Sequence, residues 1–372
     1  MWCCITSLVL LIRGISTGNL PEATTMDLTC MTRLSQLFEV FARLEAGESV
    51  ALGAGGGEVV FPPPRNGVFL GVRSSGTTGI PKIVWRPWAG LRSETRVDLR
   101  THGWHWASPF RPDSFAGVQA ALQAWAAGGT IDSLSTNWDG VWAAHRSRPW
   151  DAWSATPTYL DLLVQNEPRR AGSGQECAQD PQQITLGGEV LRPNCGARLL
   201  ARFPRTRFTV VYASAEWGVL LKTHRLDGWY EVESLKRRHP TWRVSDGAIE
   251  LGLPDGTWTK TGDLVEVEGH LVRVIGRCDR VANVAGTKVN LDEIARMAEL
   301  VPGVRRAVAV AEANPVTGQV IALRYSPESG ADPVAVEKAL GAALRTSLPK
   351  PAWPRRWVKD DLLPGRNAKQ AL

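Results

Sequence analysis

The chain has 372 residues, of which 44% are hydrophobic and 22% charged, and this composition excludes general disorder because it allows a sizeable core. Its formal net charge of +6 favours acidic partners such as nucleotides, but no recognition motif accompanies the basic residues, so nucleic acid is not expected as a partner. The cysteines form no CxxC pair and no Cys/His cluster at metal-ligand spacing, so neither a zinc site nor a disulfide framework is indicated and a reducing, cytoplasmic location fits best.

The first segment, residues 1–33, is interpreted as an uncertain leader, with a mis-assigned start as the favoured interpretation. Trp2 to Ile12 form an apolar run of about eleven residues, whereas a helix that crosses a bilayer needs roughly 20. No basic segment precedes this run, so a secretory signal is the weaker interpretation. We expect the chain to start at Met26 or Met31 and to have no stable membrane insertion.

Residues 34–278 alternate short apolar runs with helical stretches, which is typical of a layered α/β domain. Apolar residues at helical spacing predict an amphipathic helix from Leu34 to Glu45. Further elements are expected as follows: strands at 68–72, 153–155, 184–186 and 208–212, helices at 116–127 and 158–165, and short antiparallel strands at 248–253, 263–267 and 270–275.

After Asp279 the pattern changes. A helix is expected at 291–300, strands at 304–311 and 320–325, and a second helix at 333–348. Together they form a compact α+β unit of about 90 residues, within the usual size of a domain. We therefore predict two domains, a large N-terminal one over residues 34–278 and a small one over residues 279–372.

The most informative segment follows the strand at 68–72 and consists of Ser74-Ser75-Gly76-Thr77-Thr78-Gly79-Ile80-Pro81-Lys82. Its two glycines let the backbone turn N–H groups inward, its hydroxyls add hydrogen-bond donors, and its final lysine adds a positive charge. Such a nest suits a polyphosphate. The GxxxxGK[ST] spacing of a P-loop is absent.

These nine residues resemble the phosphate-loop signature of the adenylate-forming (AMP-binding) superfamily, which includes acyl-CoA synthetases, amino-acid-adenylating domains and luciferases. Further motifs that resemble those of the family follow in its order: Gly187-Gly188-Glu189, Tyr212-Ala213-Ser214-Ala215-Glu216, Thr261-Gly262-Asp263, Gly276-Arg277-Cys278-Asp279, Asn283 to Val289, and loosely Pro364 to Lys369. The resemblance runs from about Phe69 to the end. It implies a large α/β N-terminal domain with a small, mobile C-terminal lid.

The resemblance also implies ATP and Mg²⁺ as cofactors and suggests roles for single residues. Tyr212 would stack on adenine, Asp263 would accept hydrogen bonds from the ribose hydroxyls, and Glu216 would hold Mg²⁺. Lys369 would bridge the carboxylate and α-phosphate oxygens as charge develops, with Lys82 as a further catalytic cation. The other ATP- and AMP-binding residues implied are Ser74, Ser75, Gly76, Thr77, Thr78, Gly79, Gly188, Glu189, Ala213, Ser214 and Arg277.

Asp279 would be the hinge about which the small domain rotates between two half-reactions. Gly286 and Lys288, beyond the hinge, would then face the thiol donor. The resemblance thus implies that a small carboxylic acid reacts with ATP to give an acyl-adenylate, from which a thiol displaces AMP. The preferred acceptor is coenzyme A, which makes the chain an AMP-forming acyl-CoA ligase.

Two alternatives stay open. The acyl group could pass to a carrier-protein thiol, or the chain could be a nucleotide-binding pseudoenzyme without turnover. Ala213, Ala215 and Ala368, which replace the family's usual residues, favour the second alternative. The acid itself is indicated only by pocket-lining candidates, which hint at an apolar or aromatic acyl group: Trp104, Trp106, Phe110, Phe115 and Trp217.

Overall fold

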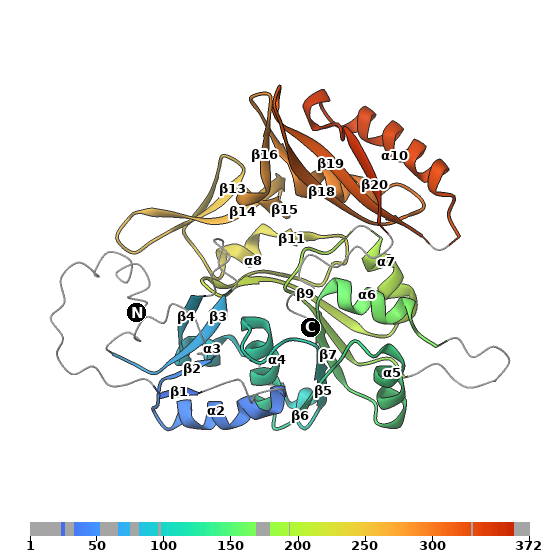
Figure 1. Cartoon of the computed structure of the whole chain (residues 1–372). Coiled ribbons are helices and arrows are strands. Elements are labelled where there is room, and N and C mark those ends of the chain that lie inside the picture. Colours follow the sequence, from blue (N-terminus) through green and yellow to red (C-terminus); the bar gives the residue numbers. More distant parts are fainter. Residues whose placement is uncertain are drawn as a thin grey trace.

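The computed structural model describes residues 24–26, 33–52, 66–74, 82–95, 98–168, 179–192, 194–328 and 330–360. These residues form five sheets with helices between and around them, which confirms the α/β fold class. In Figure 1 the later strands and helix α10 (Pro333–Ser347) lie above the larger body built by the preceding elements. Of the expected leader, only strand β1 (Thr24–Met26) and Arg33 belong to the described residues.

The first sheet has the strand order β1-β2-β3-β4, with β2 at Val50–Leu52, β3 at Phe69–Ser74 and β4 at Lys82–Pro87. A 3₁₀ turn, η3 (Leu34–Gln36), runs into helix α2 (Leu37–Glu45), which confirms the helix expected at 34–45. Strands β3 and β4 are antiparallel, and their register sets Ser74 opposite Lys82. The two ends of the expected phosphate loop therefore lie side by side, while residues 75–81 lie outside the described part of the chain.

The second sheet is the centre of the larger body and has the order β10-β9-β8-β7-β5-β6. Its strands are parallel except for β10, and helices cross between the parallel ones, as parallel pairing requires. The strands are β5 (His105–Ser108), β6 (Thr130–Ser133), β7 (Ala152–Ala155), β8 (Gln183–Leu186), β9 (Arg207–Ser214) and β10 (Gly218–Thr223). The helices are α4 (Phe115–Ala126), α5 (Trp138–Ser147), α6 (Pro157–Gln165) and α7 (Cys195–Arg202).

The side chains of this sheet alternate between two faces. On β7, β8 and β9 one set, including Trp153, Leu186 and Val210, joins a buried apolar cluster with residues of α5, α6 and α7. The other set, including Ser154 and Thr185, points to the opposite face. Alternation of this kind follows from the two-residue period of a strand, and here it places the apolar cluster on one face and the hydroxyls of Ser154 and Thr185 on the other.

An aromatic group lies within the apolar cluster, between α5 and β7. The ring of His145 stacks on Trp150 with centroids 5.3 Å apart and meets Trp153 edge-on at 4.9 Å. Its Nδ1 accepts a hydrogen bond from the Trp150 backbone N–H (3.1 Å), so its Nε2–H donates to the Gln179 carbonyl (2.7 Å). Burial lowers the pKa of His145, because a charged imidazolium is poorly solvated there.

Acid is therefore expected to weaken the fold through His145. The unfolded chain binds this proton more readily than the folded chain, so the contribution to stability is present above the ordinary value of 6.5 and lost as the pH falls below it. The free energy of unfolding in urea should fall between about pH 7.5 and pH 5.5, and the fall should be smaller in His145→Gln. The same fall in both proteins would contradict this assignment.

The third sheet is antiparallel, with the order β11-β15-β14-β13-β12. Its strands are β11 (Trp229–Glu231), β12 (Trp242–Ser245), β13 (Ala248–Gly252), β14 (Trp258–Glu268) and β15 (Leu271–Arg277), with helix α8 (Val232–Lys236) after β11. Strands β13, β14 and β15 confirm the three short strands expected at 248–275.

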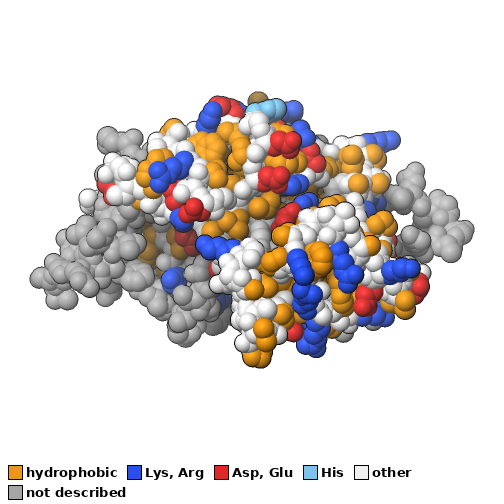
Figure 2. Space-filling model, turned by 90° about the horizontal axis from the view of Figure 1, so that it is seen from above, with side chains coloured by type: hydrophobic (Ala, Val, Ile, Leu, Met, Phe, Trp, Pro, Cys, Tyr) orange, Lys and Arg blue, Asp and Glu red, His pale blue; other side chains and the backbone are white. Residues whose placement is uncertain are grey.

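The remaining elements, from residue 278 to residue 359, form the upper part of Figure 1 and are called the upper unit. A 3₁₀ turn, η5 (Cys278–Arg280), leads into them. They are the hairpin β16 (Val281–Val284) and β17 (Thr287–Asn290), helix α9 (Leu291–Glu299), strands β18 (Val304–Asn314) and β19 (Gly318–Pro327), helix α10, turn η6 (Lys350–Ala352) and strand β20 (Arg356–Lys359). Figure 2, which looks down on the molecule, shows basic, acidic and hydrophobic side chains interspersed over this face.

This unit has its own apolar cluster, whose buried members all lie between Ala282 and Ala352. The four elements expected after Asp279 are confirmed as α9, β18, β19 and α10. Their starts are set locally: the Asn290 side chain caps α9 by accepting from two backbone N–H groups, and Asp332 caps α10 in the same way. The boundary at Asp279 falls within η5 and stays a prediction. No helix in the described part of the chain combines the length and apolar character needed to cross a membrane.

Candidate functional site

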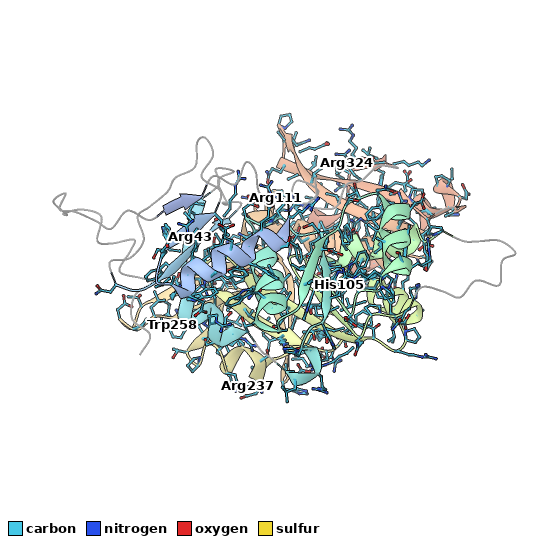
Figure 3. All side chains as sticks on the ribbon, turned by 90° about the horizontal axis from the view of Figure 1, so that it is seen from below. Arg43, His105, Arg111, Arg237, Trp258 and Arg324 are labelled. Atoms are coloured by element: carbon cyan, nitrogen blue, oxygen red, sulfur yellow. The ribbon has the colours of Figure 1, made fainter. Side chains whose placement is uncertain are left out.

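A cleft of about 1730 Å³ runs along the face of the six-stranded sheet that carries Ser154 and Thr185, and it reaches β14 and β15 of the third sheet. Helix α4 and the loop after β5 form another wall, from which Arg111, labelled in Figure 3, borders the cleft. Seven of the expected site residues line it: Ser74, Gly188, Ala213, Ser214, Glu216, Arg277 and Asp279. The fold thus gathers residues that are far apart in the sequence around one cavity.

Beside the cleft, Asp263 joins Tyr212 and Arg277 in one hydrogen-bonded group. Asp263 is 4% exposed, and its Oδ1 lies 3.2 Å from Nη1 of Arg277. The Tyr212 hydroxyl is hydrogen-bonded to the same carboxyl group. Burial is the main cause that raises the pKa of both Asp263 and Tyr212, and Asp263 adds to it for the tyrosine. Arg277 also donates through Nε to Asp279 (3.1 Å).

Strand pairing explains this group. Asp263 on β14 stands opposite Arg277 on β15 in the antiparallel register. The backbone of Gly262, between Thr261 and Asp263, has φ = +85°, and a Cβ there would come within 3.3 Å of the Arg277 guanidinium. Glycine in the Thr261-Gly262-Asp263 motif therefore lets the arginine reach the carboxylate.

The turn that carries Glu216 is held by a buried arginine that the sequence did not single out. Arg86, on β4, is 4% exposed and donates from Nη1 to the Glu216 carbonyl (2.8 Å). Gly218 follows the turn with φ = +73°, and a Cβ there would lie 2.6 Å from Nη2 of Arg86. The Glu216 side chain itself is exposed at the cleft. Arg86 therefore fixes the backbone while leaving the carboxylate open.

That carboxylate suits Mg²⁺, which is commonly held by one or two carboxylates together with substrate phosphates. No group of three or more His, Cys, Asp or Glu side chains in the described ranges could hold a metal ion on its own. A metal at Glu216 would therefore depend on phosphate oxygens of the ligand.

Other expected site residues lie outside the cleft lining. Lys82 is exposed at the start of β4, and Gly286 and Lys288 are exposed on the β16–β17 hairpin. Glu189 follows Gly188 but is not part of the cleft lining, and its buried Oε2 has no hydrogen-bond partner among the described residues. The expected residues Ser75, Gly76, Thr77, Thr78, Gly79 and Lys369 fall outside the described part of the chain.

The expected acyl-pocket aromatics do converge. The cleft lining includes all five: Trp104, Trp106, Phe110, Phe115 and Trp217.

A buried contact that the sequence analysis did not predict joins the upper unit to the larger body. Glu299, at the end of α9, accepts from Nη1 of Arg192 and from the backbone N–H of Ala307 (3.0 Å). Arg306 on β18 donates to the Thr158 hydroxyl of α6 at 3.1 and 3.2 Å. Burial lowers the pKa of Arg306 to about 10. Arg192 follows the Gly187-Gly188-Glu189 turn closely in the sequence.

No protein-family model matches the chain. By sequence it is 24% identical over 341 residues to a D-alanine–D-alanyl carrier protein ligase of Staphylococcus epidermidis, covering 81% of this chain and 69% of that protein. Over 91 residues, 24% of this chain and 16% of the other, it is 34% identical to a salicylyl-CoA synthase / salicylate adenylyltransferase of a Streptomyces species.

By structure the chain is similar to an ATP-bound MatB from Rhodopseudomonas palustris, with a TM-score of 0.61 and 17% identity over 83% of this chain and 68% of the other. An amide bond synthetase from Marinactinospora thermotolerans gives a TM-score of 0.60 and 18% identity over 80% of this chain and 66% of the other. An anthranilate CoA ligase with bound anthranoyl-AMP gives 0.62 and 12%, over 80% and 64%. The chain thus spans about two thirds of each solved structure. The relatives are adenylate-forming ligases, and the predicted resemblance to their superfamily is confirmed.

Proposed function

We propose that this chain, which has the fold of the adenylate-forming ligases, activates a carboxylic acid with ATP through an acyl-adenylate. The observation that carries the proposal is the Tyr212–Asp263–Arg277 group at the edge of a cleft that Ser74 and Glu216 also line. These residues stand in the motifs whose resemblance to the family implies contacts with adenine, ribose, phosphate and metal.

The proposed chemistry follows from these side chains. The Asp263 carboxylate would accept from the two ribose hydroxyls, and Arg277 next to it would offer donors to ribose or phosphate oxygens. With Mg²⁺ bound at Glu216, the metal would neutralise phosphate charge as pyrophosphate leaves. Lys369 and Lys82 stay proposed catalytic cations, and residues 74–79 the proposed phosphate loop. Gly188, Glu189, Ala213 and Ser214 stay proposed nucleotide contacts.

The acceptor of the acyl group is proposed to be the thiol of coenzyme A. Gly286 and Lys288, exposed on the β16–β17 hairpin, are proposed to face it after rotation about Asp279. The relatives do not favour one acceptor, since one is a carrier-protein ligase, another a CoA ligase and a third an amide bond synthetase. Transfer to a carrier protein is therefore the second candidate.

Acid-dependent release of pyrophosphate and AMP from ATP tests the proposal. The full chain would be incubated with Mg²⁺, ATP and a panel of short, long-chain and aryl acids, each with and without coenzyme A. Pyrophosphate with thioester supports the CoA ligase, and pyrophosphate without thioester supports the carrier-protein ligase. No release with any acid would favour a nucleotide-binding protein without turnover.

A further inference from the structure

Three hydroxyl side chains form a row across the sheet face that opens into the cleft. Ser154 on β7 is the register partner of Thr185 on β8, which is the register partner of Thr209 on β9. All three line the cleft, while their chain neighbours point to the apolar cluster on the opposite face. The row is thus built into the strand register rather than placed by a loop.

The half-buried side-chain amide of Gln183 contacts two of these hydroxyls. Its Nε2 donates to the Ile184 carbonyl and to Oγ1 of Thr209, both at 3.0 Å, and lies 3.5 Å from Oγ1 of Thr185. Because a hydroxyl that accepts still carries its own O–H, both threonines can donate a hydrogen bond in turn. Ser154 and Thr209 are both buried, at 7% and 5% exposure. A ligand group that paired with these hydroxyls would do so away from competing solvent.

The row lies at a defined depth. Thr185 precedes Gly187 by two residues, and Gly187 lies beside the proposed nucleotide position. The hydroxyl row therefore lies about 7 Å from Gly187 along the strand direction. Beyond the row the lining becomes more polar, with Gln183 and Arg207 in the next register row. Across from the sheet, α4 presents Phe115, Gln119 and Gln123 at helical spacing.

The hydroxyl row disfavours a long alkyl chain. Such a chain would desolvate the donors of Thr185 and Thr209 without a compensating hydrogen bond.

We propose that the acid is short or contains a single ring, that it carries an uncharged hydroxyl or amino substituent, and that Thr185 and Thr209 select for this substituent. The proposal rests on the proposed function and names its substrate class. The sequence suggested an apolar or aromatic acyl group, and the proposal narrows that expectation. The aromatic side chains form only part of the cleft wall, and the sheet face that forms its floor offers hydrogen bonds.

Matched pairs of acids test the inference through pyrophosphate release. Benzoic acid would be compared with its hydroxy and amino derivatives, butanoic acid with its hydroxy derivatives, and octanoic acid would represent long chains. The best substituted acid should exceed its parent in kcat/KM by about 10-fold or more, since sites built to bond a substrate hydroxyl discriminate strongly against analogues that lack it. Octanoic acid should be the poorest substrate.

Thr185→Val and Thr209→Val remove the hydroxyl at nearly constant volume. Each should reduce the preference for the substituted acid about 10-fold while sparing the unsubstituted parent. Thr130→Val, on the exposed edge strand β6 outside the cleft lining, is the control and should change neither acid.

Preference for unsubstituted acids, or equal losses with both members of a pair, would overturn the inference while pyrophosphate release still supported the proposed function. If no acid releases pyrophosphate, the proposed function fails. Calorimetric binding of the same acid pairs to the native chain and to Thr185→Val then decides the inference: tighter binding of the substituted acid, lost in the variant, supports it, and equal binding overturns it.

Discussion

Asp263→Asn is expected to lower kcat/KM for ATP about 100-fold and to leave the chain at least as stable at neutral pH. The loss has a direct cause, because two hydrogen bonds from ribose to a charged carboxylate contribute about 1.5–3 kcal/mol each and an amide accepts them less strongly. The amide has nearly the shape of the carboxyl group, so packing around β14 and β15 is retained. Steady-state kinetics at varied ATP measure the loss.

The stability of this variant follows from the raised pKa of Asp263. The folded chain holds this proton to a higher pH than the unfolded chain, whose value is near 3.8, so the contribution to stability is present at low pH and lost as the pH rises through the folded pKa. Asparagine does not titrate, so Asp263→Asn does not lose this contribution to stability as the pH rises. The Arg277 side chain is 43% exposed and keeps Asp279 as a partner at 3.1 Å, so the substitution does not leave it unpaired.

Thermal unfolding at pH 4 and pH 7 measures this part of the prediction, and Glu268→Gln, at an exposed position of the same strand, is the control. The native chain should lose stability relative to Asp263→Asn between the two pH values. An inactive variant that is also much less stable would show that Asp263 supports the fold rather than the reaction.

Glu299→Ala is expected to destabilise the chain by about 3–5 kcal/mol, since it removes the anion from a buried contact and leaves Arg192 without its carboxylate partner. Glu299 is 5% exposed, and the Arg192 side chain 16%. Urea unfolding measures the loss. Limited proteolysis at Cys278–Arg280 tests whether the upper unit separates from the larger body.

Glu312→Ala is the matched control, because Glu312 pairs with Arg356 at 3.1 Å on the surface, where such pairs contribute about 0–1 kcal/mol. The double variant Arg192→Met with Glu299→Met should be less destabilised than Glu299→Ala, since an apolar pair leaves one fewer buried charge unpaired. If Glu299→Ala and Glu312→Ala were equally mild, the contact would not hold the two parts together.

Local patterns predicted several elements with a strong period, although helices α5 and α7 were not predicted. Helix α2 and helix α10 show apolar residues at helical spacing, and β7 followed by α6 shows an apolar run, a proline and a capping threonine. The short strands β4 and β16 were missed. Each has only a few residues and is stabilised by a partner strand, which a single sequence does not identify.

The candidate site was predictable to the extent that its residues stand in short motifs. The carboxylate of Asp263 and the guanidinium of Arg277 could be named this way, although their pairing depends on the β14–β15 register. The contact between Arg192 and Glu299 joins residues 107 positions apart and leaves no local pattern. The hydroxyl row did leave a local pattern, because polar and apolar residues alternate along β8. Treating the polar residues of this strand as candidates for the cleft would have indicated Thr185.

Arg277 binds Asp263 on one side and Asp279, the proposed hinge, on the other. If a nucleotide ribose takes over the Asp263 carboxylate, it changes the partners of the same guanidinium that holds the joint. Thermodynamic linkage then requires reciprocity: the factor by which nucleotide shifts the orientation of the upper unit is also the factor by which that orientation shifts nucleotide affinity. A single arginine would thus make occupancy of the site and domain orientation two measurements of one coupling free energy.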